Sequence, residues 1–157
     1  RLTLAECPRA AVPLLSEVIR LVMQQNKVRV SIQPKADCVK DAVAIIEKLK
    51  AARWVGFNDG DLRKMKEVKR YAQSIPVFWD RPGNTDIDKD LQIARNEGFE
   101  SLVLYHEGVT KAKVEKIHQA GLEAGAWTVN DAKRMEALLV MGVDRSTRTI
   151  RGGFCNC

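Results

Sequence analysis

The stretch SLVLYHEGVTKAKVEKIHQAGLEAGAWTVN, residues 101–130, carries the pattern that decides the fold. An apolar run at 101–105 is followed by an amphipathic helical pattern that starts on Thr110 and stops at Gly121, and a second apolar run starts at Gly125. A threonine at a helix start and a glycine at its end suit the unpaired backbone groups of helix termini. The stretch predicts a strand, a helix and a second strand parallel to the first.

The same alternation extends over most of the chain. The apolar runs are rich in β-branched and aromatic residues, and they fall at 28–33, 54–59, 76–80, 101–105 and 125–130, with a stump at 142–144. Amphipathic helical patterns lie between several of them, at 37–52, 86–98, 110–121 and 130–142. Parallel strands that are buried on both faces read as nearly continuous apolar runs, so we expect βαβ units and a parallel sheet.

Two architectures use such units, and the glycine pattern favours one of them. Neither G-x-G-x-x-G nor G-x-x-x-x-G-K occurs in the sequence, so a doubly wound nucleotide-binding fold lacks its characteristic phosphate loop. We therefore predict a (βα) barrel, in which functional residues lie at the carboxyl ends of the strands.

The residues at the predicted strand ends suit a polar, phosphate-bearing ligand. A lysine can neutralise a phosphate, carboxylate and amide oxygens suit a hard divalent metal, and aromatic side chains can form the wall of a pocket. The candidates are Gln33, Lys35, Phe57, Asn58, Asp59, Trp79, Asp80, Tyr105, His106, Trp127, Thr128 and Asn130.

Structural roles compete with functional ones for several residues. The patterns predict core positions for Trp54 and Phe78, helix caps for Asp59 and Asp131, and a surface position for His118. His106 is a candidate base, although a lone histidine at a strand end is more often structural.

The charge and the hydropathy of the sequence indicate which classes of partner the chain has. The 26 Lys and Arg residues outnumber the 20 Asp and Glu residues, which gives a formal net charge of +6. Because many basic residues stand beside acids on helical patterns, as on solvated helix surfaces, we expect no nucleic-acid partner. No apolar run approaches the roughly 20 residues needed to span a bilayer. The four cysteines, Cys7, Cys38, Cys155 and Cys157, match no C-x-x-C pattern and are interpreted as free thiols.

Several segments resemble the glycerophosphodiester phosphodiesterase family. WTVN (127–130), followed by a helix and GVD (142–144), is the most specific match. RLTLAE (1–6) resembles the family's LTLAE segment, AVPLLSEVIRLV (11–22) its P-x-L-x-E-V-L helix, VRVSIQPK (28–35) its I-E-I-K strand, and WVGFND (54–59) stands where the family has a strand ending in SF.

The resemblance implies the TIM-type barrel of the phospholipase C-like phosphodiesterases. It also implies metal-assisted hydrolysis of glycerophosphodiesters to glycerol 3-phosphate and an alcohol, in which a histidine pair transfers protons. The family's H-R-G, E-x-D and H-D segments precede LTLAE, and none of them occurs in this sequence. We therefore expect an N-terminally truncated barrel that is inactive by itself.

Part of the family's site carries over to this sequence. Lys35 matches the lysine that contacts phosphate, and Phe57 and Trp127 match aromatic positions at the mouth of the barrel. Gln33 stands where the family has a third metal carboxylate. The resemblance implies Mg²⁺ or Ca²⁺ as cofactor, and a neutral glutamine predicts weaker metal binding than a carboxylate.

The end of the sequence departs from the family pattern. The family continues GVD with a strand of the type R-I-Y-T-D-x-P, whereas this chain reads RSTRTIRGGFCNC from Arg145. Permitted codons for this tail, read from the third base of the Arg145 codon, give IYTDDPRRLLQL. We expect a frameshift or a sequence error there, so that 1–144 is a partial barrel and 145–157 an aberrant tail.

These expectations lead to two functional hypotheses. The first is part of a glycerophosphodiester phosphodiesterase-like enzyme, and the alternative is a non-catalytic module that binds phosphate esters. Because an open barrel exposes strand edges, we also expect marginal stability, self-association or dependence on a partner chain.

Overall fold

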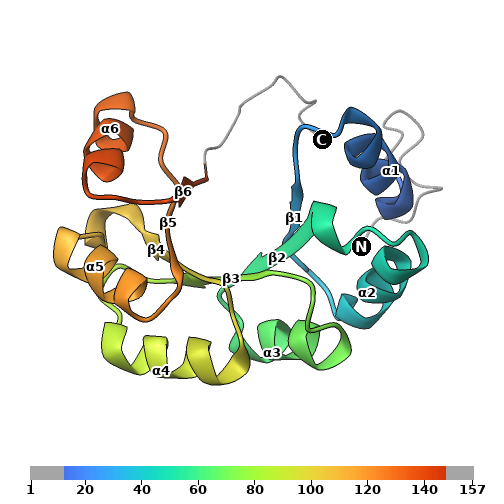
Figure 1. Ribbon diagram of the computed structural model, residues 1–157, viewed down its shortest axis with the longest axis horizontal. Coiled ribbons are helices and arrows are strands. Elements are labelled where there is room, and N and C mark those ends of the chain that lie inside the picture. The colour runs from blue at the N-terminus through green and yellow to red at the C-terminus, as the bar shows by residue number, and fades with distance from the viewer. Residues whose placement is uncertain (1–12, 148–157) are drawn as a thin grey trace.

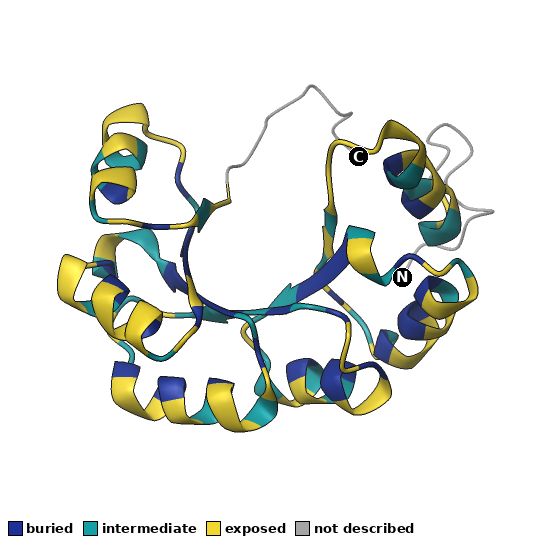
Figure 2. Cartoon of the chain, in the orientation of Figure 1, coloured by how far each residue is buried: buried dark blue, intermediate teal, exposed yellow. Residues whose placement is uncertain are grey.

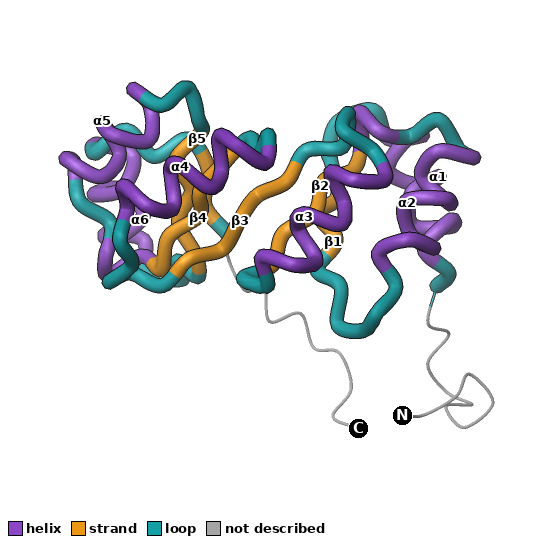
Figure 3. Tube along the Cα trace, turned by 90° about the horizontal axis from the view of Figure 1, so that it is seen from below, coloured by secondary structure: helices purple, strands orange, loops and turns teal. Residues whose placement is uncertain are grey.

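The computed structural model describes residues 13–147, and in this part of the chain six parallel strands form one sheet whose order follows the chain. The strands are β1 (Val30–Ile32), β2 (Val55–Asp59), β3 (Val77–Arg81), β4 (Ser101–Tyr105), β5 (Glu123–Trp127) and β6 (Arg145–Ser146). The sheet curls, and the helices lie along its outer side, so that the described residues form an open half-barrel (Figure 1). Figure 3 shows the same alternation of strands and helices from below. The predicted parallel α/β barrel architecture is thus confirmed.

Several of the six helices begin at a residue whose side chain accepts a hydrogen bond from the first turn. They are α1 (Leu15–Gln25), α2 (Val39–Lys48), α3 (Leu62–Tyr71), α4 (Ile87–Glu97), α5 (Lys111–Gln119) and α6 (Ala132–Val140), with short 3₁₀ turns η2 (Ala52–Trp54) and η3 (His106–Gly108). The Thr110 side chain accepts a hydrogen bond from the Lys113 N–H, as the sequence predicts for the start of α5. Gly98 follows α4 with φ of +70°, a left-handed conformation that glycine adopts without strain.

Of the two predicted caps, Asp131 is observed and Asp59 lies two residues before the observed cap. Asp61, rather than Asp59, caps α3 by accepting hydrogen bonds from two backbone N–H groups. Asp131 caps α6 as predicted, through the Arg134 N–H at 2.7 Å, which leaves Asn130 outside the N-cap position. The starts of α3 and α6 were therefore predicted to within two residues.

The last strand lies later in the chain than predicted. The stump expected at 142–144 is the turn before β6, and Arg145 and Ser146 pair with Gly125 and Ala126 of β5. Thr147 continues this pairing, since its N–H donates to the Ala126 carbonyl at 2.9 Å. Only 145–147 of the predicted aberrant tail belong to the described residues, so the frameshift stays a prediction. The RLTLAE segment and Cys7, Cys155 and Cys157 lie outside the described residues.

The main core lies between the outer face of the sheet and the helices. Figure 2 shows the buried side of each helix turned toward the sheet. Phe57 and Trp79 are among the largest fully buried side chains, with 0% and 2% of their surface exposed. Burial of one such side chain stabilises the fold by about 1.5–3 kcal/mol. Trp54 packs against this core as predicted, although it is only partly buried.

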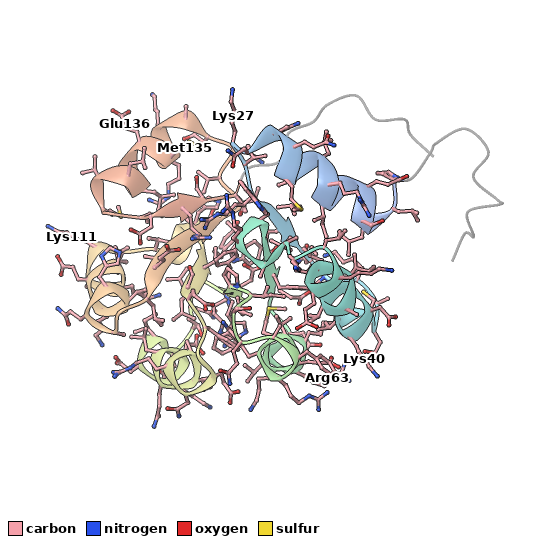
Figure 4. All side chains as sticks on the ribbon, turned by 45° about the vertical axis from the view of Figure 1, so that its right-hand side comes forward. Lys27, Lys40, Arg63, Lys111, Met135 and Glu136 are labelled. Atoms are coloured by element: carbon pink, nitrogen blue, oxygen red, sulfur yellow. The ribbon has the colours of Figure 1, made fainter. Side chains whose placement is uncertain are left out.

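Charged side chains cover the outer surface of the helices. Lys40, Arg63 and Lys111 project away from the molecule in Figure 4, and Lys111 forms an i,i+4 ion pair with Glu115. This is the solvated helix surface that the mixed-charge patterns predict. Within residues 13–147, no helix is long and apolar enough to cross a membrane.

Candidate functional site

A cavity of about 800 Å³ opens at the carboxyl ends of the strands. Strand ends and the loops that follow them supply its lining: Gln33, Gly60, Asp80, Arg81, Pro82, Gly83, Asn84, Tyr105, Glu107, Gly108 and Trp127. Four of the residues that the sequence placed at strand ends, namely Gln33, Asp80, Tyr105 and Trp127, are thus brought together around one space.

The alternation of side chains along each strand decides which residues reach this space. Phe57 and Trp79 belong to the hydrophobic core under the helices. Their neighbours Asn58 and Asp80 project to the concave face of the sheet, where their side chains hydrogen-bond to each other. The prediction that Phe57 contacts substrate at the mouth is therefore corrected: its side chain is fully buried on the opposite face.

A polar ladder, Ser31–Asn58–Asp80, crosses three neighbouring strands on the concave face. The Ser31 hydroxyl donates to Asn58 Oδ1 at 2.7 Å, and Asn58 Nδ2 donates to Asp80 Oδ2 at 3.0 Å. Both polar atoms of the Asn58 amide are engaged, so the amide has one orientation. This ladder fixes the position of the Asp80 carboxylate at the cavity.

Charges around Asp80 give it an unusual protonation equilibrium. Burial raises the pKa of the Asp80 carboxyl, the Asn58 hydrogen bond lowers it, the negative charge of Asp59 raises it, and the positive charge of Lys35 lowers it. The net direction is upward, so burial outweighs the favourable partners. Asp59 itself is held by Lys64, with 3.8 Å between Oδ2 and Nζ.

The two predicted phosphate and metal contacts lie at the end of β1. Gln33 lines the cavity. Lys35 follows two residues later as an exposed side chain, and its charge acts on Asp80. An exposed ammonium beside a cavity is free to neutralise an anion as a point charge.

Aromatic rings form one wall of the cavity. The Tyr105 and Trp127 rings meet edge to face with 5.4 Å between their centroids. Trp127 Nε1 donates to the Arg81 carbonyl at 3.3 Å, which ties the indole to the end of β3. The predicted position of Trp127 at the mouth is therefore one where its ring can pack against a bound molecule.

Two loops of the cavity wall touch at glycines, a contact that sequence reasoning missed. Gly83, in the loop after β3, lies so close to Gly108 of η3 that a Cβ built on Gly108 would lie 2.1 Å from the Gly83 Cα. Lys113 of α5 fastens both loops, since its Nζ donates to the Gly83 carbonyl at 2.5 Å and the Gly108 carbonyl at 3.0 Å. No local pattern in the sequence marks this contact, because it joins segments about 25 residues apart.

A buried ion pair between Arg81 and Asp90 connects the two ends of the β3–α4 loop, which contains Gly83. Arg81 Nε donates to Asp90 Oδ2 at 2.8 Å, and Asp90 is 3% exposed. The Thr85 hydroxyl also donates to Asp90. The β3–α4 loop is therefore held at both ends, which favours a preformed cavity wall.

Neither histidine takes a position that indicates catalysis. The His106 ring packs on Tyr105 with 4.8 Å between centroids, and its buried Nδ1 lacks a hydrogen-bond partner among the described residues. His118, predicted to lie at the surface, is partly exposed and pairs with Asp144 at 2.8 Å. It lies on α5, and neither histidine is among the residues that line the cavity.

The oxygen donors at the cavity do not fit a resident divalent cation by themselves. Ca²⁺ takes six to eight oxygen ligands, and Mg²⁺ is octahedral and usually bound by one or two carboxylates together with waters and substrate phosphates. Gln33 is neutral, Asp80 uses one oxygen in the ladder, and among residues 13–147 no group of three His, Cys, Asp or Glu side chains is arranged to hold a metal.

A parallel (βα) half-barrel with its polar cavity at the carboxyl ends of the strands defines a site of the TIM-barrel class. Solved structures share this fold. A glycerophosphodiester phosphodiesterase from Parabacteroides distasonis matches with a TM-score of 0.74 at 20% identity, over 87% of this chain and 59% of its own. An Oleispira antarctica phosphodiesterase, solved with the product sn-glycerol-3-phosphate, matches with a TM-score of 0.71 at 18% identity, over 87% and 57%.

A third structure, a candidate glycerophosphoryl diester phosphodiesterase from Silicibacter pomeroyi, matches with a TM-score of 0.75 at 20% identity, over 87% of this chain and 52% of its own. This chain thus spans about half the length of that relative. A comparison with curated protein sequences returned no significant match. The sequence model of the glycerophosphoryl diester phosphodiesterase family matches residues 3–145, and the chain belongs to that family.

Proposed function

We propose that this chain supplies the substrate-binding part of a glycerophosphodiester phosphodiesterase-like site. Lys35 would neutralise the phosphate, Gln33 would donate or accept a hydrogen bond beside it, and Trp127 would pack on the organic part of the ester. The observation that carries the proposal is the convergence of Gln33, Asp80, Tyr105 and Trp127 on one cavity, where the charge of Lys35 acts on Asp80. Family membership adds the substrate class.

Turnover needs groups that these 157 residues do not contain. Proton transfer in the family rests on histidines of H-R-G and H-D segments, and those segments do not occur in this sequence. The described oxygen donors also do not make a cation site by themselves. We therefore expect this chain alone to bind phosphate esters without hydrolysing them, which is also what a non-catalytic binding module would do.

The binding test uses a matched pair of lysine variants of the full chain. Lys35→Met keeps the length of the side chain and removes its charge at the cavity. Lys40→Met makes the same change on α2, where the side chain projects away from the molecule (Figure 4). Glycerol 3-phosphate is titrated by calorimetry, and a partly exposed charge contact of about 1 kcal/mol predicts an about fivefold weaker affinity for Lys35→Met.

Unchanged affinity in Lys35→Met, or equal loss in both variants, would refute the proposed phosphate contact. Hydrolysis is measured separately by phosphorus NMR on glycerophosphocholine with Mg²⁺ or Ca²⁺. Metal-dependent turnover by the wild-type chain would overturn the expectation of binding without hydrolysis and would favour the enzyme over the binding module.

We also propose that the chain self-associates through its two end helices. Leu21 of α1 is 54% exposed, and Leu139 and Val140 of α6 are 64% and 82% exposed. These helices flank the open side of the half-barrel (Figure 1). Sedimentation should show association that Val140→Lys weakens, whereas a concentration-independent monomer would contradict the proposal.

A further inference from the structure

Asp80 is a carboxylate of the cavity lining that the proposed phosphate contact leaves unused. Its carboxylate faces the same space as Gln33 and Trp127, and it belongs to no ion pair among residues 13–147. A carboxylate repels a phosphate, so its presence beside Lys35 calls for a second part of the ligand. The inference below rests on the proposed function and adds a group recognised by Asp80.

The ladder leaves one oxygen of Asp80 available to a ligand. Asn58 donates to Oδ2, and within the described residues no hydrogen bond involves Oδ1. The oxygen is accessible rather than buried and unpaired, because the buried unpaired side-chain atoms of the described chain are His106 Nδ1 and Arg145 Nε. Asp80 therefore offers a fixed, charged acceptor toward the cavity, and such acceptors make stronger hydrogen bonds than neutral ones.

The neighbouring lysine selects the kind of donor that this acceptor takes. A cationic group would meet the Asp80 carboxylate but also the repulsion of Lys35, which lies close enough to act on Asp80. A hydroxyl group is neutral to both. Lys35 and Asp80 together suit an ester that carries both a phosphate and a hydroxyl, as glycerol phosphates do.

We propose that Asp80 is a specificity-determining residue that accepts a hydrogen bond from a hydroxyl of the alcohol carried by the bound phosphate ester. The ligand class is a phosphorylated polyol. The Ser31–Asn58 part of the ladder positions the carboxylate and makes no contact with the ligand. A site that hydrogen-bonds a hydroxyl discriminates against analogues lacking it, because the acceptor, once covered by the bound analogue, is left without a partner.

The test compares three phosphate esters on the full chain. Glycerol 3-phosphate carries hydroxyls, ethyl phosphate lacks them, and phosphoethanolamine replaces them with an ammonium. We expect wild-type protein to bind glycerol 3-phosphate about tenfold tighter than the other two. Asp80→Ala should bring the ratio between glycerol 3-phosphate and ethyl phosphate to about one, while ethyl phosphate binds equally well or better because a negative charge is gone.

Two further variants separate recognition from charge and from folding. Glu107→Gln removes another carboxylate from the same cavity and should change the affinities for glycerol 3-phosphate and ethyl phosphate by one common factor, which leaves their ratio unchanged. Asp80→Asn keeps the shape and the bond to Asn58, and it should reduce the ratio at least threefold with a native circular dichroism spectrum.

The outcomes distinguish this inference from the proposed function. If the wild-type chain binds glycerol 3-phosphate and ethyl phosphate equally, or if both Asp80 variants keep the wild-type ratio, the role of Asp80 is overturned and the phosphate contact stands. If phosphoethanolamine binds most tightly, Asp80 recognises a cation and the hydroxyl assignment is wrong. If the wild-type chain binds none of the esters, the proposed function fails and this inference fails with it.

Discussion

A methyl group at position 108 has no room, and Gly108→Ala therefore tests the contact between the two cavity loops. The added Cβ would lie 2.1 Å from the Gly83 Cα, 2.2 Å from its carbonyl oxygen and 2.3 Å from its carbonyl carbon. All three are backbone atoms, so no side-chain rotation can relieve the overlap. The φ of Gly108 lies outside the left-handed range, which leaves space, rather than backbone strain, as the cause of the expected effect.

The size of the effect follows from the distances. Carbon atoms pack at about 3.5 Å or more, so the two loops must separate by about 1.4 Å. Overpacking usually costs about 1–3 kcal/mol, and an overlap with rigid backbone belongs at the upper end. For a chain of this length, about 3 kcal/mol corresponds to a fall in Tm of about 6–12 °C. The separation should also stretch the Lys113 hydrogen bonds and weaken phosphate-ester binding.

The matched control is Gly60→Ala in the same cavity. A Cβ on Gly60 would meet its nearest neighbour, the Asp80 carbonyl oxygen, at 3.5 Å, which is ordinary contact. Its replacement should leave Tm unchanged or raise it slightly, since alanine restricts the unfolded chain. Thermal unfolding followed by circular dichroism compares both variants with the wild type. If Gly108→Ala and Gly60→Ala unfold at the same Tm, the close contact of the loops is not a feature of the folded protein.

Three further predictions concern a core side chain, Phe57, and the two carboxyls whose pKa is shifted, Asp144 and Asp80. Phe57→Leu should lower stability by about 1–2 kcal/mol and leave the affinity for glycerol 3-phosphate unchanged, because the ring lies in the core; a selective loss of affinity would restore its predicted role at the mouth. Partial burial raises the pKa of Asp144, but hydrogen bonds from His118 and the Ala124 N–H outweigh this effect. The pKa of Asp144 therefore lies below its ordinary value. Ionised Asp144 thus stabilises the fold above the unfolded pKa, so Asp144→Asn should lower Tm at pH 7, and the difference should vanish as the pH falls through the folded pKa. The effect of Asp80 on stability has the opposite sign, because its raised pKa makes the ionised form unfavourable in the fold. Asp80→Asn should therefore raise Tm at pH 7, and the gain should fade as the wild-type carboxyl becomes protonated at lower pH. A fall in Tm at pH 7 would contradict this reasoning.

The arrangement of strands and helices could be predicted from the sequence because local signals agree with the global fold. The apolar run at 101–105 is the observed β4, and Thr110 caps α5 where the pattern places it. In a parallel sheet with its helices on one side, the spacing of strands and helices largely specifies the neighbours of each strand.

The candidate site was predictable only in part, because successive side chains of a strand point to opposite faces of the sheet. An error of one residue in the alignment therefore moves a side chain from the cavity to the core. A family pattern places an aromatic residue near the end of β2, yet Phe57 packs in the core, and it is Asn58 whose side chain bonds to Ser31 and Asp80 on the concave face. The change from apolar to polar residues at Asn58, directly after Phe57, is a sequence signal for this assignment. The Gly83–Gly108 contact and the Lys113 clamp had no comparable signal, since they depend on how two loops meet in space.

The simple order of the strands has a consequence for how the protein is made. Each strand from β2 to β6 pairs with the strand synthesised just before it. No described strand must wait for a distant partner, and the loops closed at each step are short, which favours fast formation of contacts. The sheet can therefore grow one βα unit at a time as the chain leaves the ribosome, with the Ser31–Asn58–Asp80 ladder complete as soon as β3 has emerged.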